Sequence, residues 1–193
     1  MRYLRKKRTQ KLIFSLILSL ILLLISTHTD WLKHTAKTAQ QNQPGLYSVV
    51  KVDDGDTIVV DMNGSKETVR FIGVDTPETH DPRKPVQCYG QEASNYTKNL
   101  LQGKSVRLQA DPLDTNRDRY GRLLRYIYLP DDTLVESKLL MEGYALAYTA
   151  FPFQKADEFT GYEKAARSAN KGLWSACQIV TDSNGARHTN PAN

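Results

Sequence analysis

The chain has 193 residues, 40% of them apolar, which suffices for one domain of about 150 residues and leaves no room for a second. The formal charge of +5 does not by itself indicate a polyanionic partner, because residues 1–40 hold 8 of the 26 basic residues and only one acidic residue, Asp30. Residues 41–193 therefore carry 18 basic and 20 acidic residues, so only a local basic patch could attract nucleic acid.

The N-terminal segment is typical of a targeting sequence. Basic residues up to Lys11 precede an apolar run at 12–25, which is shorter than the roughly 20 residues of a spanning helix. The positive charges stay in the cytoplasm, so we expect the body outside the cytoplasmic membrane. Two alternatives stay open. Residues 1–27 are either a signal peptide of a secreted protein or an anchor on the outer face of the membrane, with membrane contact through residues 12–25.

The polar segments at the two ends predict chain without regular structure. Residues 28–45 are rich in Gln, Thr and Lys, and we interpret them as a flexible tether. Residues 178–193 have the same character, which predicts a disordered tail. The periodic patterns lie between them, so the predicted domain spans residues 46–177.

The domain begins with strand patterns and continues with interposed helices. Five segments have strand-like alternation: 46–52, 57–62, 67–74, 105–110 and 122–129. Three segments have apolar residues at helical spacing: 89–101, 136–142 and 155–171. This order predicts a mainly β fold with α-helices, namely a five-stranded Greek-key OB-fold barrel with three helices. We expect a monomer.

Two cysteines, Cys88 and Cys177, occur in the chain. An even number of cysteines in an exported chain is compatible with a disulfide, and their spacing matches no zinc or CxxC motif. A Cys88–Cys177 disulfide and two separate buried thiols both stay open.

Three aspartates surround one glycine in the sequence DDGD at 53–56. Turn geometry accounts for Asp53 and Asp54, while Asp56 needs a donor or a cation. Pairing of the second and third strands brings Asp56 close to Asp75, and two neighbouring carboxylates repel unless a cation lies between them. With no His or Cys nearby, we expect Ca²⁺ bound by Asp56, Asp75 and the Thr76 carbonyl.

Two arginines and a glutamate follow this pattern of carboxylates. Arg70 and Arg122 can each donate two parallel hydrogen bonds to a phosphate. Glu78 stands three residues beyond Asp75 and can act as a general base on a metal-bound water. Each residue alone is compatible with ordinary surface charge, whereas together they supply what phosphodiester hydrolysis needs.

The motifs DGDT, VRFIGVDTPE and DRYGR, in this order, resemble the staphylococcal nuclease family, also called thermonuclease or micrococcal nuclease. The resemblance extends over about residues 46–174 and includes YGQEAS and GLW. It implies an OB-fold barrel with three helices that hydrolyses DNA and RNA with calcium and leaves 3′-phosphates. It assigns catalysis to Arg70, Glu78 and Arg122. It assigns calcium binding to Asp56, Asp75 and Thr76.

The same resemblance implies a nucleotide-binding surface with tyrosines at Tyr120 and Tyr148, where a base can stack; rim packing is the alternative role of both rings. A second tyrosine of the family pattern is missing, because TAF occupies 149–151, and Phe151 or Phe153 is the expected substitute. Candidates for a local basic rim are Arg83, Lys84, Arg117, Arg119 and Arg125.

Three functions therefore compete. The first is an exported, calcium-dependent nuclease with little sequence specificity. The second is a non-catalytic barrel that binds nucleic acid or protein, and the third is a membrane-tethered spacer. The metal and arginine positions are all retained, which favours the nuclease, because a binding module has no need of that set.

Overall fold

The computed structural model describes residues 17, 19, 21, 45–79 and 85–192. The chain divides into two compact units, Met1–Gln41 and Asn42–Asn193, and every strand and helix discussed below belongs to the second. The predicted leader and tether lie almost entirely outside the described residues. Within the described ranges, no helix has the length and apolar character needed to cross a membrane.

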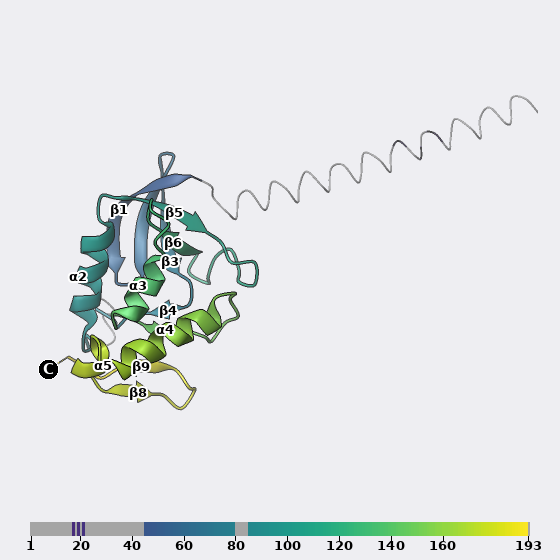
Figure 1. Ribbon diagram of the computed structural model, residues 1–193. Helices are drawn as coiled ribbons and strands as arrows, with labels where there is room; N and C mark the ends of the chain where they lie inside the picture. The colour runs from purple at the N-terminus through teal and green to yellow at the C-terminus, as the bar shows by residue number, and fades with distance from the viewer. Residues whose placement is uncertain (1–16, 18, 20, 22–44, 80–84, 193) are drawn as a thin grey trace, which may run out of the picture. The chain divides into compact units, whose positions relative to one another are not determined.

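Five strands close into a barrel, as the sequence predicted (Figure 1). In barrel order the strands are β1 (Leu46–Asp54), β2 (Thr57–Met62), β3 (Ser65–Phe71), β6 (Leu123–Tyr128) and β5 (Ser105–Gln109). The β3–β6 pair is parallel, and the other neighbours are antiparallel. The β2–β3 hairpin turns at Asn63 and Gly64, and both residues have positive φ. Two-residue turns of this kind are favoured in hairpins because their backbone twist matches that of the two strands.

The predicted helices are present with slightly different ends: α2 (Gly90–Leu101), α3 (Val135–Met141) and α4 (Ala156–Ser168). The described residues include a fourth, short helix, α5 (Leu173–Ala176), in a segment that the sequence analysis left without structure. The expected third helix ends early, at Ser168, and Asn170 beyond it has a φ of 50°, which does not continue a helix. Gly172, at a φ of 55°, then lies against the backbone at Gly143. A side chain on Gly172 would approach the Gly143 oxygen to 2.3 Å, so both glycines are needed at this contact.

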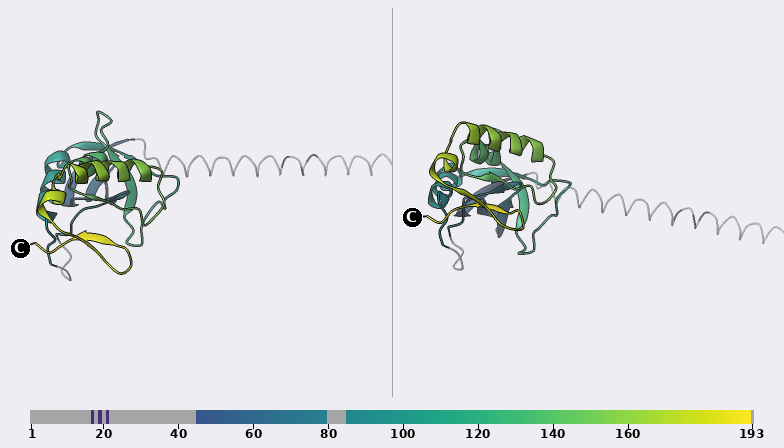
Figure 2. Two further views of the ribbon diagram at one scale, coloured as in Figure 1. Left: turned by 60° about the horizontal axis from the view of Figure 1, so that its bottom comes forward. Right: turned by 90° about the horizontal axis from the view of Figure 1, so that it is seen from below.

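The hydrophobic core fills the barrel and continues under the helices. Alternate residues of the strands, such as Ile58, Val69 and Ile127, point inward and are fully buried. Leu139 of α3 and Phe159 of α4 join the same cluster, so the two helices extend the core beyond the barrel. Figure 2 shows α4 lying across the barrel from two further directions.

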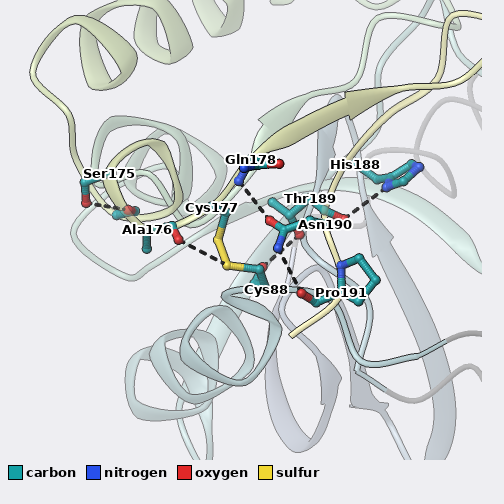
Figure 3. Close-up of a disulfide and its surroundings, with 10 residues drawn as sticks. Cys88, Ser175, Ala176, Cys177, Gln178, His188, Thr189, Asn190 and Pro191 are labelled. Atoms are coloured by element: carbon teal, nitrogen blue, oxygen red, sulfur yellow. Dashed lines mark hydrogen bonds between the residues drawn. A yellow bond between two sulfur atoms is a disulfide. The ribbon is translucent and has the colours of Figure 1, made fainter. Parts of the chain in front are cut away.

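The prediction of a disordered tail at 178–193 is wrong for the described residues up to 192. Two short strands, β8 (Ile179–Thr181) and β9 (Arg187–Thr189), form an antiparallel hairpin, visible as a separate ribbon in Figure 2. Polar composition concealed it, because its stability comes from contacts outside the segment. Cys177 forms a disulfide with Cys88, and the backbone N–H of Cys88 donates to the Asn190 carbonyl at 2.7 Å (Figure 3).

Two further short strands connect the barrel with this region. Strand β4 (Val74–Asp75) pairs with β7 (Leu146–Ala147), so that Asp75 lies opposite Leu146. Because β4 follows β3 almost directly, this small sheet holds Asp75 beside the end of the barrel strand that carries Arg70.

Candidate active site

The aspartate-rich turn between β1 and β2 is fixed by its own side chains. Asp53 pairs with Lys51 at 2.6 Å, which accounts for the first aspartate as surface charge. Asp54 Oδ1 accepts from the Gly55 N–H at 2.8 Å and from the Thr79 hydroxyl at 3.0 Å. The turn is therefore fastened to the segment that follows β4, as the Asx geometry of a turn aspartate allows.

The third aspartate, Asp56, is 6% exposed and serves a different purpose. Its Oδ2 accepts from the backbone N–H of Thr76 at 2.8 Å and from the Thr76 hydroxyl at 2.9 Å. The Thr57 hydroxyl donates to Oδ1 at 3.0 Å. These bonds orient a nearly buried carboxylate toward the end of β4.

Arg70 lies between the two carboxylates that the sequence brought together. Its guanidinium forms an ion pair with Asp56 through Nη1 and donates from Nη2 to Asp75 Oδ1 at 2.6 Å. The expectation that Asp56 and Asp75 converge is therefore met in the structure. The expectation that only a metal ion can bring them together is not met, because one guanidinium contacts both carboxylates, and its single positive charge offsets one of their two negative charges.

The second arginine, Arg122, precedes β6, the parallel neighbour of β3. Val69 pairs with Leu123, so Arg122 stands one residue before that pair and on the same side of the sheet as Arg70. Burial lowers the pKa of Arg70, Asp75 raises it, and the charge of Arg122 lowers it further. The two guanidiniums thus lie close enough for their charges to interact.

Asp118 holds Arg122 in place, a role that the sequence analysis missed. Its Oδ2 accepts from Arg122 Nε at 2.7 Å, and its Oδ1 accepts from the backbone N–H groups of Tyr120 and Arg122. Burial acts to raise the pKa of Asp118, but the hydrogen bonds from Arg122 and Tyr120 outweigh it, and the pKa is lowered. The spacing of the motif DRYGR was the signal, since an aspartate commonly bonds to backbone two residues on.

Tyr120 and Arg119 lie on the surface beside this turn. Tyr120 is 66% exposed, and its hydroxyl accepts from Arg119 Nη2 at 2.6 Å. The guanidinium of Arg119 also lies 4.8 Å from the centre of the Tyr120 ring, a cation–π distance. An exposed ring between charged groups presents a surface on which a base can stack.

Other members of the expected basic rim are placed differently. Arg125 is fully buried and donates to the Asn116 carbonyl and side-chain oxygen, so its assignment to the rim is wrong. Burial lowers the pKa of Arg125 to about 10, with the charge of Arg117 acting in the same direction. Arg117 is exposed but pairs with Glu67 at 2.9 Å. The remaining two candidates, at 83 and 84, lie outside the described residues.

Glu78 follows the carboxylate pair on the segment after β4. Its backbone N–H donates to the Gln87 side chain at 2.8 Å, and its Oε1 accepts from the Thr79 N–H at 3.0 Å. Thr79 also bonds to Asp54, so the glutamate is tied to the same turn as Asp56. Sequence analysis named Glu78 but not Thr79 or Gln87, which fix its backbone.

The side chains at the site suit a hard cation. The carboxylates of Asp56 and Asp75 both contact one positive group, Arg70, so their oxygens already converge. The described residues contain no group of three or more His, Cys, Asp or Glu side chains able to hold a metal. Two carboxylates, a nearby carbonyl at Thr76 and water match the irregular oxygen shell that Ca²⁺ accepts.

A cavity of about 330 Å³ adjoins Asp75. Tyr148 lies on its wall, 39% exposed, and its backbone N–H donates to the Gly73 carbonyl at 2.9 Å. Phe151 is 61% exposed, with its ring centre 6.1 Å from that of Tyr148, whereas Phe153 is buried against Phe159. Of the two phenylalanines considered as a substitute for the missing tyrosine, only Phe151 is available at the surface.

The chain is similar to known proteins over most of the barrel domain. Residues 68–176 match the family model described as staphylococcal nuclease homologue. The thermonuclease of Staphylococcus hyicus is 45% identical over 130 residues, which cover 67% of this chain and 75% of the relative. Endonuclease YncB of Bacillus subtilis is 41% identical over 164 residues, with 81% and 77% covered. The SPbeta prophage-derived endonuclease YokF of that species is 44% identical over 131 residues, with 67% and 44% covered.

Proposed function

Since the chain belongs to the family of staphylococcal nuclease homologues, we propose that it is a calcium-dependent nuclease with little sequence specificity. It hydrolyses phosphodiester bonds of DNA and RNA and leaves 3′-phosphate ends. The observation that carries the proposal is the cluster of Asp56, Arg70 and Asp75, with Arg122 beside it. A buried arginine paired with two carboxylates next to a second arginine is a costly arrangement for a merely structural barrel.

The two arginines bind the phosphate in this proposal. Arg122 is oriented by Asp118, and its side chain is 30% exposed, so its free N–H groups can reach a substrate. The Arg70 side chain is 14% exposed, and its N–H groups are paired with carboxylates. It can therefore bind the phosphate only when another cation binds those carboxylate oxygens. Their positive charge then stabilises the negative charge that accumulates on the phosphate oxygens in the transition state.

Glu78 takes the proton of the attacking water. Its Oε1 is already held by the Thr79 N–H, so the carboxylate has a fixed orientation at the edge of the site. The water oxygen forms a bond to phosphorus while the bond from phosphorus to the 5′ oxygen breaks. Glu78 passes its proton to solvent, the leaving 5′ oxygen takes up a proton from solvent and departs as a hydroxyl, and the 3′ end keeps the phosphate.

Asp56, Asp75 and the Thr76 carbonyl are the residues that would hold Ca²⁺. When bound, the ion would polarise the phosphate and lower the pKa of a coordinated water. Asp56 contributes the more rigid ligand, since Thr57 and Thr76 fix both of its oxygens. Asp75 is 39% exposed and contributes the more adaptable one.

We also propose that the enzyme works outside the cytoplasmic membrane, either secreted or anchored through residues 12–25. The apolar run after a basic segment supports this, and so does the Cys88–Cys177 disulfide, because such bonds persist in oxidising compartments. Fractionation of cells, followed by N-terminal sequencing of the product, distinguishes a cleaved signal peptide from a retained anchor. Recovery of the whole protein from the cytoplasm would contradict export.

A digestion assay tests the nuclease. Plasmid DNA and an oligoribonucleotide are incubated with the protein in CaCl₂, in MgCl₂ and in EGTA, and product ends are identified by mass spectrometry. We expect cleavage with 3′-phosphate ends in calcium alone, and the Asp56→Asn variant should need more calcium. Full activity in EGTA would contradict the metal assignment, and tight binding without cleavage would instead support the non-catalytic module.

A further inference from the structure

The β8–β9 hairpin lies beyond residues 68–176, which match the family model, and nothing described so far gives it a function. It is attached to the body at both ends. The Cys88–Cys177 disulfide fixes its beginning (Figure 3). At its end, the Ala192 N–H donates to the Val86 carbonyl at 2.8 Å. The Thr189 hydroxyl adds a bond to the Cys88 carbonyl at 2.8 Å, so the hairpin occupies a defined position.

An ion pair then joins the hairpin to the strand beside the active site. Arg187 of β9 contacts Glu163 of α4 through two bonds, at 2.6 and 2.9 Å, and donates to the Ala147 carbonyl at 2.9 Å. Glu163 also accepts from the Ala147 N–H at 2.6 Å. Ala147 belongs to β7, whose partner strand carries Asp75, so the hairpin is positioned relative to an expected metal ligand.

The tip of the hairpin closes one side of the cavity next to Asp75. Residues 184–187 line it together with Asp75 and residues 146–150, and its volume is about 330 Å³. A volume near 300 Å³ is at the small end of ligand sites and suits one nucleoside. Tyr148, a residue whose ring can stack on a base, and Asn184, whose amide can form hydrogen bonds, are both among the lining residues.

Asn184 is suited to such a contact. Its Oδ1 accepts from the Ala186 N–H at 3.0 Å, which fixes the orientation of the amide. Within the part of the chain that the structure describes, its Nδ2 group donates no hydrogen bond, so both donors are available to oxygen or nitrogen acceptors of a base or sugar.

We propose that the hairpin is part of the substrate-binding surface and that its tip, residues 184–187, encloses one nucleoside of the nucleic-acid strand against Tyr148, next to the phosphate at Asp75. The Arg187–Glu163 pair and the disulfide are the positioning elements of this subsite. The inference rests on the proposed nuclease function, because that function is what places a phosphate beside Asp75.

Filling the cavity tests the proposal. Ala186→Trp places a large ring on the cavity wall, and Ser183→Trp, at the exposed residue just before the tip and outside the cavity, is the matched control. In a Glu78→Gln background, binding of a fluorescein-labelled eight-nucleotide DNA in CaCl₂ is followed by fluorescence anisotropy. If the tryptophan ring displaces one stacked base, Kd should rise about tenfold or more for Ala186→Trp. The control should change Kd by less than about twofold.

Circular dichroism would reveal whether the tryptophan variants fail to fold. A second pair of variants tests the proposal in that case. Asn184→Asp removes both N–H donors and adds a negative charge to the cavity, whereas Ser183→Asp adds the same charge outside it. We expect a larger rise in Kd for Asn184→Asp. Equal Kd values within either folded pair overturn the proposed subsite.

The outcomes distinguish the subsite from the nuclease. With Glu78 intact, Ala186→Trp should raise KM and leave kcat nearly unchanged, as expected for lost uniform binding. Cleavage that is normal in all variants, with unchanged Kd, overturns the subsite and leaves the nuclease standing. Binding that depends on the cavity, without any cleavage, supports the subsite and refutes the nuclease.

Discussion

Removing the disulfide should lower the stability of the domain by a predictable amount. The bond joins residues separated by 89 positions, and loop-closure entropy for a loop of this length gives about 4 to 5 kcal/mol in the free energy of unfolding. In a Cys88→Ser/Cys177→Ser variant, the bond from the Thr189 hydroxyl to the carbonyl of residue 88 remains possible, so the folded state should keep its local contacts. We therefore expect the loss to come mainly from a less restricted unfolded chain.

Urea unfolding followed by circular dichroism measures this change. The oxidised wild-type protein is compared with the double serine variant, and wild-type protein in a reducing agent is the matched control, which should unfold at the same urea concentration as the variant. A loss below about 1 kcal/mol would refute the loop-closure reasoning, since the predicted value is several times larger. Two reactive thiols in the denatured, oxidised protein would refute the bond itself.

Three further changes test the site and the core. Arg122→Lys keeps the charge but loses the parallel donors, so kcat should fall by about 100-fold or more in steady-state assays, and an unchanged kcat would make the arginine ordinary surface charge. Asp118→Asn removes the charged partner of Arg122 and should lower kcat by about tenfold with little change in KM; a change in KM alone would contradict a positioning role. Burial raises the pKa of Glu136, so the folded state binds more protons, and stability should fall as pH rises from about 4.3 to the raised value. Glu136→Gln keeps an acceptor for the Ile127 N–H and should remove this decline of the melting temperature with pH, whereas the control Glu92→Gln, at an exposed position, should keep it. Parallel profiles of melting temperature against pH for the wild type and Glu136→Gln would refute the role of Glu136.

The barrel was predictable because its signals are local. Alternating apolar residues mark strands, and the Asn63-Gly64 turn sets the register of β2 and β3, so each barrel strand could be placed from a short window of sequence. The family resemblance was confirmed by the match over residues 68–176. The end of the last long helix was harder to predict, because Asn170, a non-glycine residue with a φ of 50°, follows it before the expected stop at Gly172.

The hairpin and the buried Arg125 show what local patterns cannot reveal. Residues 178–192 resemble a disordered tail in composition, and they are ordered by a disulfide to Cys88 and by the pairing of Arg187 with Glu163. Arg125 was assigned to the basic rim because of its charge. Its position on β6 points the side chain inward, where the guanidinium donates a hydrogen bond to the Asn116 side chain. The two errors differ in cause: partners distant in sequence order the hairpin, whereas Arg125 shares the inner face of β6 with Leu123 and Ile127 by strand alternation.

The position of Arg70 changes the argument for a metal ion. Asp56 and Asp75 can lie close together without calcium, because Arg70 contacts both carboxylates, although its single positive charge offsets one of their two negative charges. The position of Arg70 beside Asp56 could have been predicted from the pairing of β2 with β3, since Arg70 pairs with Thr57, the residue after Asp56. In the proposed nuclease, the positive charge of Arg70 therefore serves two tasks, holding the carboxylates together and binding a phosphate. A cation that occupies the carboxylates releases the guanidinium for substrate, so in the proposed nuclease metal binding and phosphate binding are linked through one side chain.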